Sequence, residues 1–294
     1  LAKNLGVSYD EALGLSENET QAALASGDLL INTKDVLAAQ QKLNEYFQAG
    51  VEFSGEIAAE FASIQKRTNL SDKAMGFFTK TSMKAGGSIK DTLKDVHTTV
   101  LEQNQQNKLA FSVKEIQEAI ANTSSRTQLI FKGNVKELSK AVIQSKMLGV
   151  EMEQLNSIAD SLLDFEGSIA AELEAELLTG RQLNLERARA AALSNDMVTL
   201  AQELKKQNID ATSFGSMNRI QQEATAKALG MSAEEMSKML INQQKLSTIQ
   251  SAFGKDIKSM SAAQAKYNQL RAEGMSAEEA GKKIGDESLA NQLE

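Results

Sequence analysis

The chain contains no proline, no cysteine and no tryptophan in 294 residues. Average usage would place about fifteen prolines in a chain of this length, and each proline inside a helix costs roughly 3 kcal/mol. Because no proline interrupts the chain, we expect long helical runs. The absence of cysteine excludes a disulfide framework and any site that depends on a thiolate.

Aromatic residues and histidine are also scarce: aromatics make up 4% of the chain, and His97 is its single histidine. One histidine without cysteine does not make the usual zinc site, and we expect His97 to lie at the surface near Asp91 and Asp95. The sequence has neither a Gly-x-Ser-x-Gly nucleophile turn nor a glycine-rich phosphate loop. We therefore predict no enzymatic activity, no cofactor and no bound metal.

Charge and hydropathy argue against two further classes of partner. A net charge of −7 opposes generic binding to nucleic-acid phosphates, so we predict no direct contact with nucleic acid. No window of eighteen mostly apolar residues occurs, which argues against a membrane span.

A glycine-hydrophobic-serine tripeptide recurs along the chain. Glycine accepts the left-handed conformation that ends a helix, the apolar residue folds back on the last turn, and serine caps the next helix. The predicted capping serines are Ser8, Ser16, Ser232 and Ser276. A glutamate three residues after each serine completes a capping box, at Glu11, Glu19, Glu235 and Glu279. Asn69-Leu70-Ser71 is a variant with asparagine for glycine and Ala74 in place of the glutamate.

The copies that begin at Gly230 and Gly274 extend the similarity to nine residues. Such a recurrence is compatible with a two-helix repeat unit or with reuse of one good connector. The residues after the first copy do not align with those after the second, which favours reuse.

These patterns predict an all-α fold of many helices joined by short Gly- or Asn-capped turns. Because large apolar side chains are sparse, we expect an elongated or oligomeric arrangement rather than one thick core. An amphipathic run that begins near Asp35 has heptad spacing, but Gln40, Gly50 and Ser54 fit a helix broken near Gly50 better than a strict coiled coil. We divide the chain into 1–80, 81–180 and a helix-turn-helix array at 181–294.

Residues 151–178 read as one acidic helix within the central region. Six apolar residues on one face of this helix, together with two methionines further on, are predicted helix-packing or interface residues: Leu155, Ile158, Leu162, Ile169, Leu173, Leu177, Met236 and Met239. The helix also carries eight carboxylates, which we expect to face solvent. Arg181, Arg187 and Arg189 follow, and they could pair with this acidic face in the same chain or in a neighbouring copy.

Specific motifs occur at Leu162–Ile169 and Glu172–Arg189, and further ones occur at Phe131–Leu138, Asn195–Leu204, Ser216–Ala224 and Ala228–Met236. These motifs resemble the tail tape measure proteins of long-tailed bacteriophages, and the resemblance covers roughly residues 80 to 250. These motifs are helical packing and capping patterns rather than catalytic signatures. The chain begins at Leu1 and lacks the long hydrophobic segments of that family, so we expect a folded portion of a longer protein.

The resemblance implies a structural virion protein that sets the length of the tail tube during assembly and is released at infection to aid genome delivery. It implies as partners sister copies of the chain and the tail tube and baseplate hub proteins, with the host envelope reached after ejection and through other segments. The implied location is the tube lumen or baseplate hub, and the host cytoplasm during assembly. Two alternatives remain open at this point: a non-viral helical adaptor or scaffold, and a membrane-inserting translocator.

Overall fold

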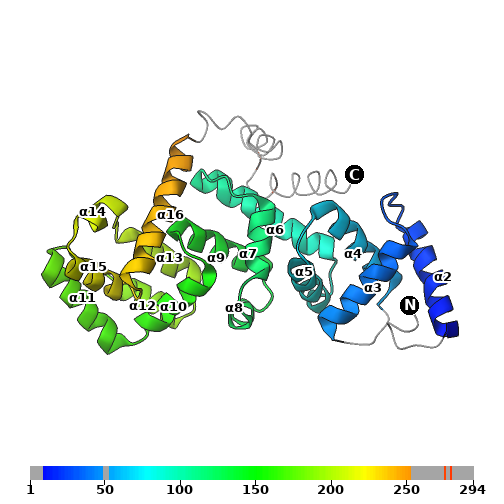
Figure 1. Ribbon diagram of the computed structural model, residues 1–294, viewed down its shortest axis with the longest axis horizontal. Helices are drawn as coiled ribbons and strands as arrows, with labels where there is room; N and C mark the ends of the chain where they lie inside the picture. Colours follow the sequence, from blue (N-terminus) through cyan, green and yellow to red (C-terminus); the bar gives the residue numbers. More distant parts are fainter. Residues whose placement is uncertain (1–8, 49–52, 253–274, 276–278, 280–294) are drawn as a thin grey trace. The chain divides into compact units, whose positions relative to one another are not determined.

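The computed structural model describes residues 9–48 and 53–252, together with Met275 and Glu279 (Figure 1). In the described part of the chain the regular structure is helical throughout, with no strand. This confirms the all-α prediction. Contacts divide the chain into two compact units, which we describe separately. They do not coincide with the three regions 1–80, 81–180 and 181–294 drawn from the sequence.

Unit 1 comprises the described residues up to Thr98, residues 113–122, and Met275 and Glu279. Its helices are α2 (Tyr9–Ala25), α3 (Thr33–Phe47), α4 (Gly55–Thr68), α5 (Asp72–Ala85), the first half of α6 (Ile89–Asn107), and α7 (Val113–Ala121). Helices α3, α4 and α5 contact one another, and their largest fully buried side chains are Leu43, Phe61, Ile64, Met75 and Phe78.

The amphipathic run that begins near Asp35 forms two helices. The first, α3, ends at Phe47, and Ser54 caps α4 by accepting a hydrogen bond from the Ile57 N–H. Gln40 is buried in this seam, where it donates to Glu19 of α2 and accepts from the Phe53 N–H (3.1 Å). A buried amide is stabilised only with such partners, so Gln40 ties three segments together instead of weakening a coiled-coil seam.

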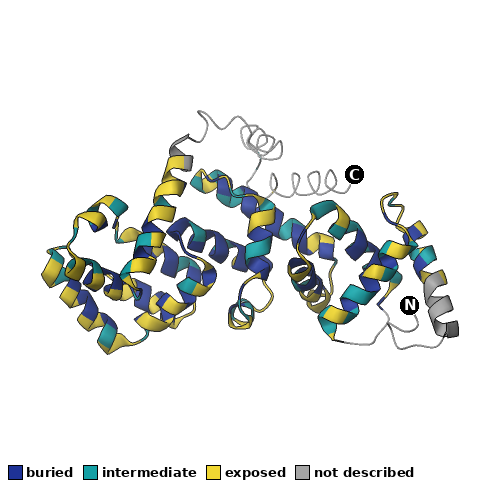
Figure 2. Ribbon diagram, viewed as in Figure 1, coloured by how far each residue is buried: buried dark blue, intermediate teal, exposed yellow. Residues whose placement is uncertain are grey.

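Unit 2 comprises residues 99–112 and the described residues 123–252. Its helices after α6 are α8 (Ser125–Ile130), α9 (Val135–Leu148), α10 (Met152–Leu162), α11 (Phe165–Thr179), α12 (Glu186–Leu193), α13 (Met197–Lys206), α14 (Ala211–Ser216), α15 (Arg219–Ala228) and α16 (Ala233–Ala252). One apolar cluster contains residues from every helix between α9 and α16, and Figure 2 shows buried residues concentrated on α9. Met236 and Met239 belong to this cluster.

Two copies of the recurring turn have the expected geometry. Asn69 is left-handed (φ 49°), Leu70 is buried, and Ser71 caps α5 through the Ala74 N–H. At the second copy, Ser232 accepts from the Glu235 N–H (3.2 Å) while the Glu235 carboxylate accepts from the Ser232 N–H (2.8 Å). In these two copies the helix therefore begins after the expected serine.

Ser16 corrects the prediction, because it lies inside α2 rather than at a helix start. Glu19, the expected capping carboxylate, is instead buried and accepts a hydrogen bond from Gln40. The helix α2 packs against α3 and α4, and it continues through the Gly-Leu-Ser tripeptide that was expected to start a new helix at Ser16. Ser8 and Ser276 lie outside the described residues.

The single acidic helix expected at 151–178 is also wrong, since α10 ends at Leu162 and α11 begins at Phe165. Asp164 caps α11 by accepting a hydrogen bond from the Gly167 N–H (3.2 Å). The break separates the expected apolar face into two parts with different environments.

Candidate interaction surface

The predicted helix-packing residues divide at this break. Leu155, Ile158 and Leu162 of α10 are buried in the core of unit 2. On α11, by contrast, Ile169 is 45% exposed, Leu173 60% and Leu177 86%.

Phe165, which is 45% exposed, extends these residues into a row with a spacing of four. We call Phe165, Ile169, Leu173 and Leu177 the α11 apolar row. Residues four apart lie on one side of a helix, and twelve residues of helix extend the row over roughly 18 Å. In Figure 2 much of the ribbon of α11 is coloured as exposed.

The buried side of α11 carries small residues and one carboxylate. It consists of Ser168, Ala171, Glu172 and Ala175, and α11 packs along α15. A helix that served only its own unit would turn its large apolar side chains inward. On α11 these side chains are exposed instead, and a contiguous exposed apolar patch of this kind is typical of an interaction site.

A buried ion pair fixes α11 in this orientation. Glu172 accepts hydrogen bonds from the Arg189 guanidinium (2.6 Å) and from the Leu185 N–H (3.0 Å), and Arg189 also donates to Ser168 Oγ (3.1 Å). The pair joins α11 to α12 within the same chain. Arg189 therefore pairs with the acidic stretch of the same chain rather than with that of a neighbouring copy. The expectation that Glu172 faces solvent is wrong, because Glu172 is buried.

The remaining contacts of the acidic stretch are also internal to unit 2. Asp160 pairs with both terminal nitrogens of Arg126, and Glu176 accepts from the Leu183 N–H (2.7 Å). Along α15, Lys227 pairs with Glu174 (3.4 Å). These hydrogen bonds and ion pairs connect neighbouring elements of unit 2 and do not involve the apolar row.

Sequence reasoning missed the environment of His97. Its side chain is 3% exposed rather than at the surface, and burial lowers its pKa to about 4. The imidazole is therefore neutral near pH 7. The signal available was its position between Val96 and Val100, which are both buried on α6.

The described residues hold no group of three metal-binding side chains. A search of the same residues finds no helix that is long and apolar enough to cross a membrane.

Comparison of the chain with protein-family models, with curated proteins and with solved structures finds no match.

Proposed function

We propose that this chain is part of a structural virion protein, a tail tape measure protein, that assembles through the α11 apolar row. The observation that supports this most directly is the α11 apolar row, whose large apolar side chains are exposed. The most specific segments of the resemblance, Leu162–Ile169 and Glu172–Arg189, contain most of α11 and the ion pair that orients it.

In this proposal the apolar row contacts a sister copy of the chain or a protein of the tail tube or baseplate hub. The protein occupies the tube lumen or hub in the virion, and it is present in the host cytoplasm during assembly. It sets the length of the tail tube and leaves the tail at infection to aid genome delivery. The role is structural and uses no catalytic residue.

A first test is a cryo-EM reconstruction of intact tails from the source particle. We expect helical density that fits units 1 and 2 inside the tube or hub, with the α11 row against a neighbouring chain. An empty lumen, with the protein found in infected-cell extract alone, would overturn the tail function and favour a helical adaptor.

A second test separates the row from the rest of the surface. Leu173→Glu with Leu177→Glu places charge on the row, and Leu129→Glu with Leu193→Glu places the same charge on leucines that are 75% and 64% exposed elsewhere in unit 2. We expect the first pair to abolish tail assembly in a complementation assay and the second pair to leave it intact. Equal assembly by both variants would contradict the role of the row.

A further inference from the structure

The exposed apolar surface of α11 continues onto α15. The Gln221 side chain donates to the Leu178 carbonyl (2.8 Å), and Lys227 pairs with Glu174 (3.4 Å), so the two helices run antiparallel. Ile220 and Lys227 are seven residues apart and lie on the same side of α15, which is the side next to α11. Ile220 therefore extends the α11 apolar row at its Leu178 end. We call the combined set the α11/α15 surface: Phe165, Ile169, Leu173, Leu177, Leu178 and Ile220.

The size of this surface suits a protein partner. Its residues are between 38% and 86% exposed, and large apolar side chains of this kind have roughly 150–200 Å² of surface each. Together they leave roughly 600 Å² of apolar surface uncovered in each copy, which is at the upper end of what single chains expose. A standard interface buries about 800 Å² per partner. The apolar surface and a polar rim therefore supply one full side of such an interface.

The α11 apolar row is complementary to a reversed copy of itself. Its residues recur every four positions, and ridges with this spacing pack between one another when two helices meet. The spacing is the same in both directions. A second α11 turned end for end therefore places Phe165 against the partner's Leu177 and Ile169 against the partner's Leu173. Ala170, which is exposed near the centre of the row, leaves room for the second helix to approach.

The charges at the two ends of the surface select this reversed orientation. Asp164 and Glu166 lie at the start of α11, and both are exposed. Arg219 lies at the opposite end, at the start of α15, where it is 90% exposed and forms a surface pair with Glu223 (3.0 Å); such a pair is worth little. An antiparallel partner brings its Glu166 towards Arg219, whereas a parallel partner would place the two acidic ends together, which is unfavourable.

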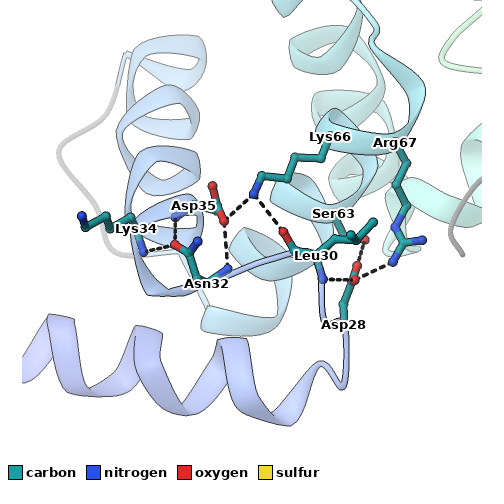
Figure 3. A network of polar contacts seen from close by, with 8 residues as sticks. All are labelled: Asp28, Leu30, Asn32, Lys34, Asp35, Ser63, Lys66 and Arg67. Carbon is teal, nitrogen blue, oxygen red and sulfur yellow. Dashed lines mark hydrogen bonds and ion pairs between the residues drawn. The ribbon is translucent and has the colours of Figure 1, made fainter.

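In unit 1, the turn between α2 and α3 exposes two leucines that serve as a control. Leu29 is 101% exposed and Leu30 is 49% exposed. Asp28 holds this turn by accepting from the Leu30 N–H (2.9 Å), from Ser63 Oγ (2.5 Å) and from Arg67 (Figure 3). Burial alone would raise the pKa of Asp28, but the hydrogen bonds from Arg67, Ser63 and Leu30 outweigh it and lower the pKa to about 2. Two leucines on one turn present much less area than the α11/α15 surface.

We propose that two copies of the chain pair through the α11/α15 surface about a two-fold axis, with their α11 helices antiparallel. Phe165 of each copy then packs against the partner's Leu177, and Arg219 meets the partner's Glu166. A two-fold interface uses the same surface on both copies, and an apolar surface with one acidic and one basic end meets that condition. The inference rests on the proposed function in one respect, because it names a sister copy as the occupant of the α11 apolar row.

Sedimentation equilibrium of the full chain measures the pairing. We expect a reversible dimer of the 31.8 kDa chain. Leu173→Glu with Leu177→Glu should weaken dimerisation at least about a hundredfold, because both copies lose leucines from the interface and gain carboxylates that repel. Leu29→Glu with Leu30→Glu adds the same charge and should change dimerisation less than about threefold, because distant exposed charges are screened. A chain that stays monomeric, or a dimer that the first pair of substitutions leaves unchanged, would overturn the inference.

Cysteine cross-linking tests the orientation, because the chain has no cysteine of its own. Phe165→Cys and Leu177→Cys are prepared as separate proteins and treated with a short bis-maleimide, each alone and as a mixture. In an antiparallel pair the two copies of either position lie roughly 18 Å apart along the helix. We therefore expect the mixture to cross-link and neither variant to do so alone. Cross-linking of each variant with itself would overturn the antiparallel arrangement.

Tail assembly and dimerisation of the same variant separate this inference from the tail function. If Leu173→Glu with Leu177→Glu abolishes the dimer but still assembles tails, the pairing is supported and the role of the row in the tail is overturned. If the wild-type chain is monomeric and this variant fails to assemble tails, the pairing is overturned and the row is left to a tube or hub protein.

Discussion

Arg189 and Glu172 show how a single buried pair can decide which side of a helix faces outward. Both side chains are 11% exposed and meet at 2.6 Å, and Glu172 also receives the Leu185 N–H at the start of α12. Removing one member of such a pair leaves the other charge buried without compensation.

We therefore expect Glu172→Ala to lower the free energy of unfolding of unit 2 by about 3 kcal/mol. Glu174→Ala is the matched control two residues along α11, because its carboxylate is 52% exposed and its contact with Lys227 is a surface pair; it should cost less than about 0.5 kcal/mol. Urea denaturation followed by circular dichroism measures both. Similar losses in the two variants would contradict the structural role of the pair.

Glycines at two helix ends provide a second comparison at this scale. Gly149 and Gly180 are both left-handed, with φ of 89° and 70°. A Cβ at Gly149 would collide with the carbonyl oxygen of Met239 on α16, whereas a Cβ at Gly180 meets nothing within 4 Å.

Gly180→Ala should cost about 1 kcal/mol, which is the conformational penalty of a left-handed non-glycine residue. Gly149→Ala adds a steric clash with the backbone of α16, so we expect it to lower the free energy of unfolding by at least about 1 kcal/mol more than Gly180→Ala does. Thermal unfolding of the two variants distinguishes these effects. Equal midpoints would mean that α16 moves away from Gly149 at no cost.

At the scale of the helix, distant carboxylates complete caps that the local sequence leaves open. Ser71 lacks the glutamate three residues later, and Glu118 of α7 accepts from both the Ser71 N–H and its hydroxyl (2.6 and 2.5 Å). Glu153 of α10 does the same for the Ser124 N–H at the start of α8 (2.6 Å). The start of a helix thus becomes a tertiary contact as well as a local one.

Glu118→Ala should destabilise unit 1 by about 1 kcal/mol, because the Ser71 N–H and the positive end of α5 lose their acceptor. Glu17→Ala, at an exposed position of α2, is the control and should have little effect. Amide hydrogen exchange of the first turn of α5 locates the change. Unaltered protection there would show that Ser71 alone is a sufficient cap.

At the scale of the whole molecule, His97 makes the stability of the folded chain depend on pH. The pKa of His97 falls from 6.5 to about 4 on burial, so between these values the unfolded chain binds a proton that the folded chain does not. By linkage, stability rises with pH in that window and falls as the pH drops from 6.5 to 4. Asp28 contributes at lower pH than His97. Its lowered pKa stabilises the folded chain above pH 3.8, and this stabilisation is lost as the pH falls from 3.8 towards 2.

The free energy of unfolding of the wild type should fall by roughly 3 kcal/mol between pH 6.5 and pH 4 because of His97, and His97→Gln should remove this loss. Urea midpoints of the wild type and the variant across this range measure the slope, and the two curves should become parallel above pH 7. Parallel curves throughout would mean that His97 titrates at its ordinary value, and hence that it is accessible to water.

Local sequence signals by themselves determined that the chain is helical and where several of its helices begin and end. The absence of proline, the turn at Asn69-Leu70-Ser71 and the box at Ser232 and Glu235 act through atoms a few residues apart, so they hold in any tertiary setting. Tertiary structure decided which residues face inward. Ser16 remains within α2 because its helix packs on α3 and α4, and Ile169, Leu173 and Leu177 face outward because Glu172 is held by Arg189. Periodicity identifies a face of a helix, but contacts between residues far apart in the chain determine whether that face is buried in the unit or left for a partner.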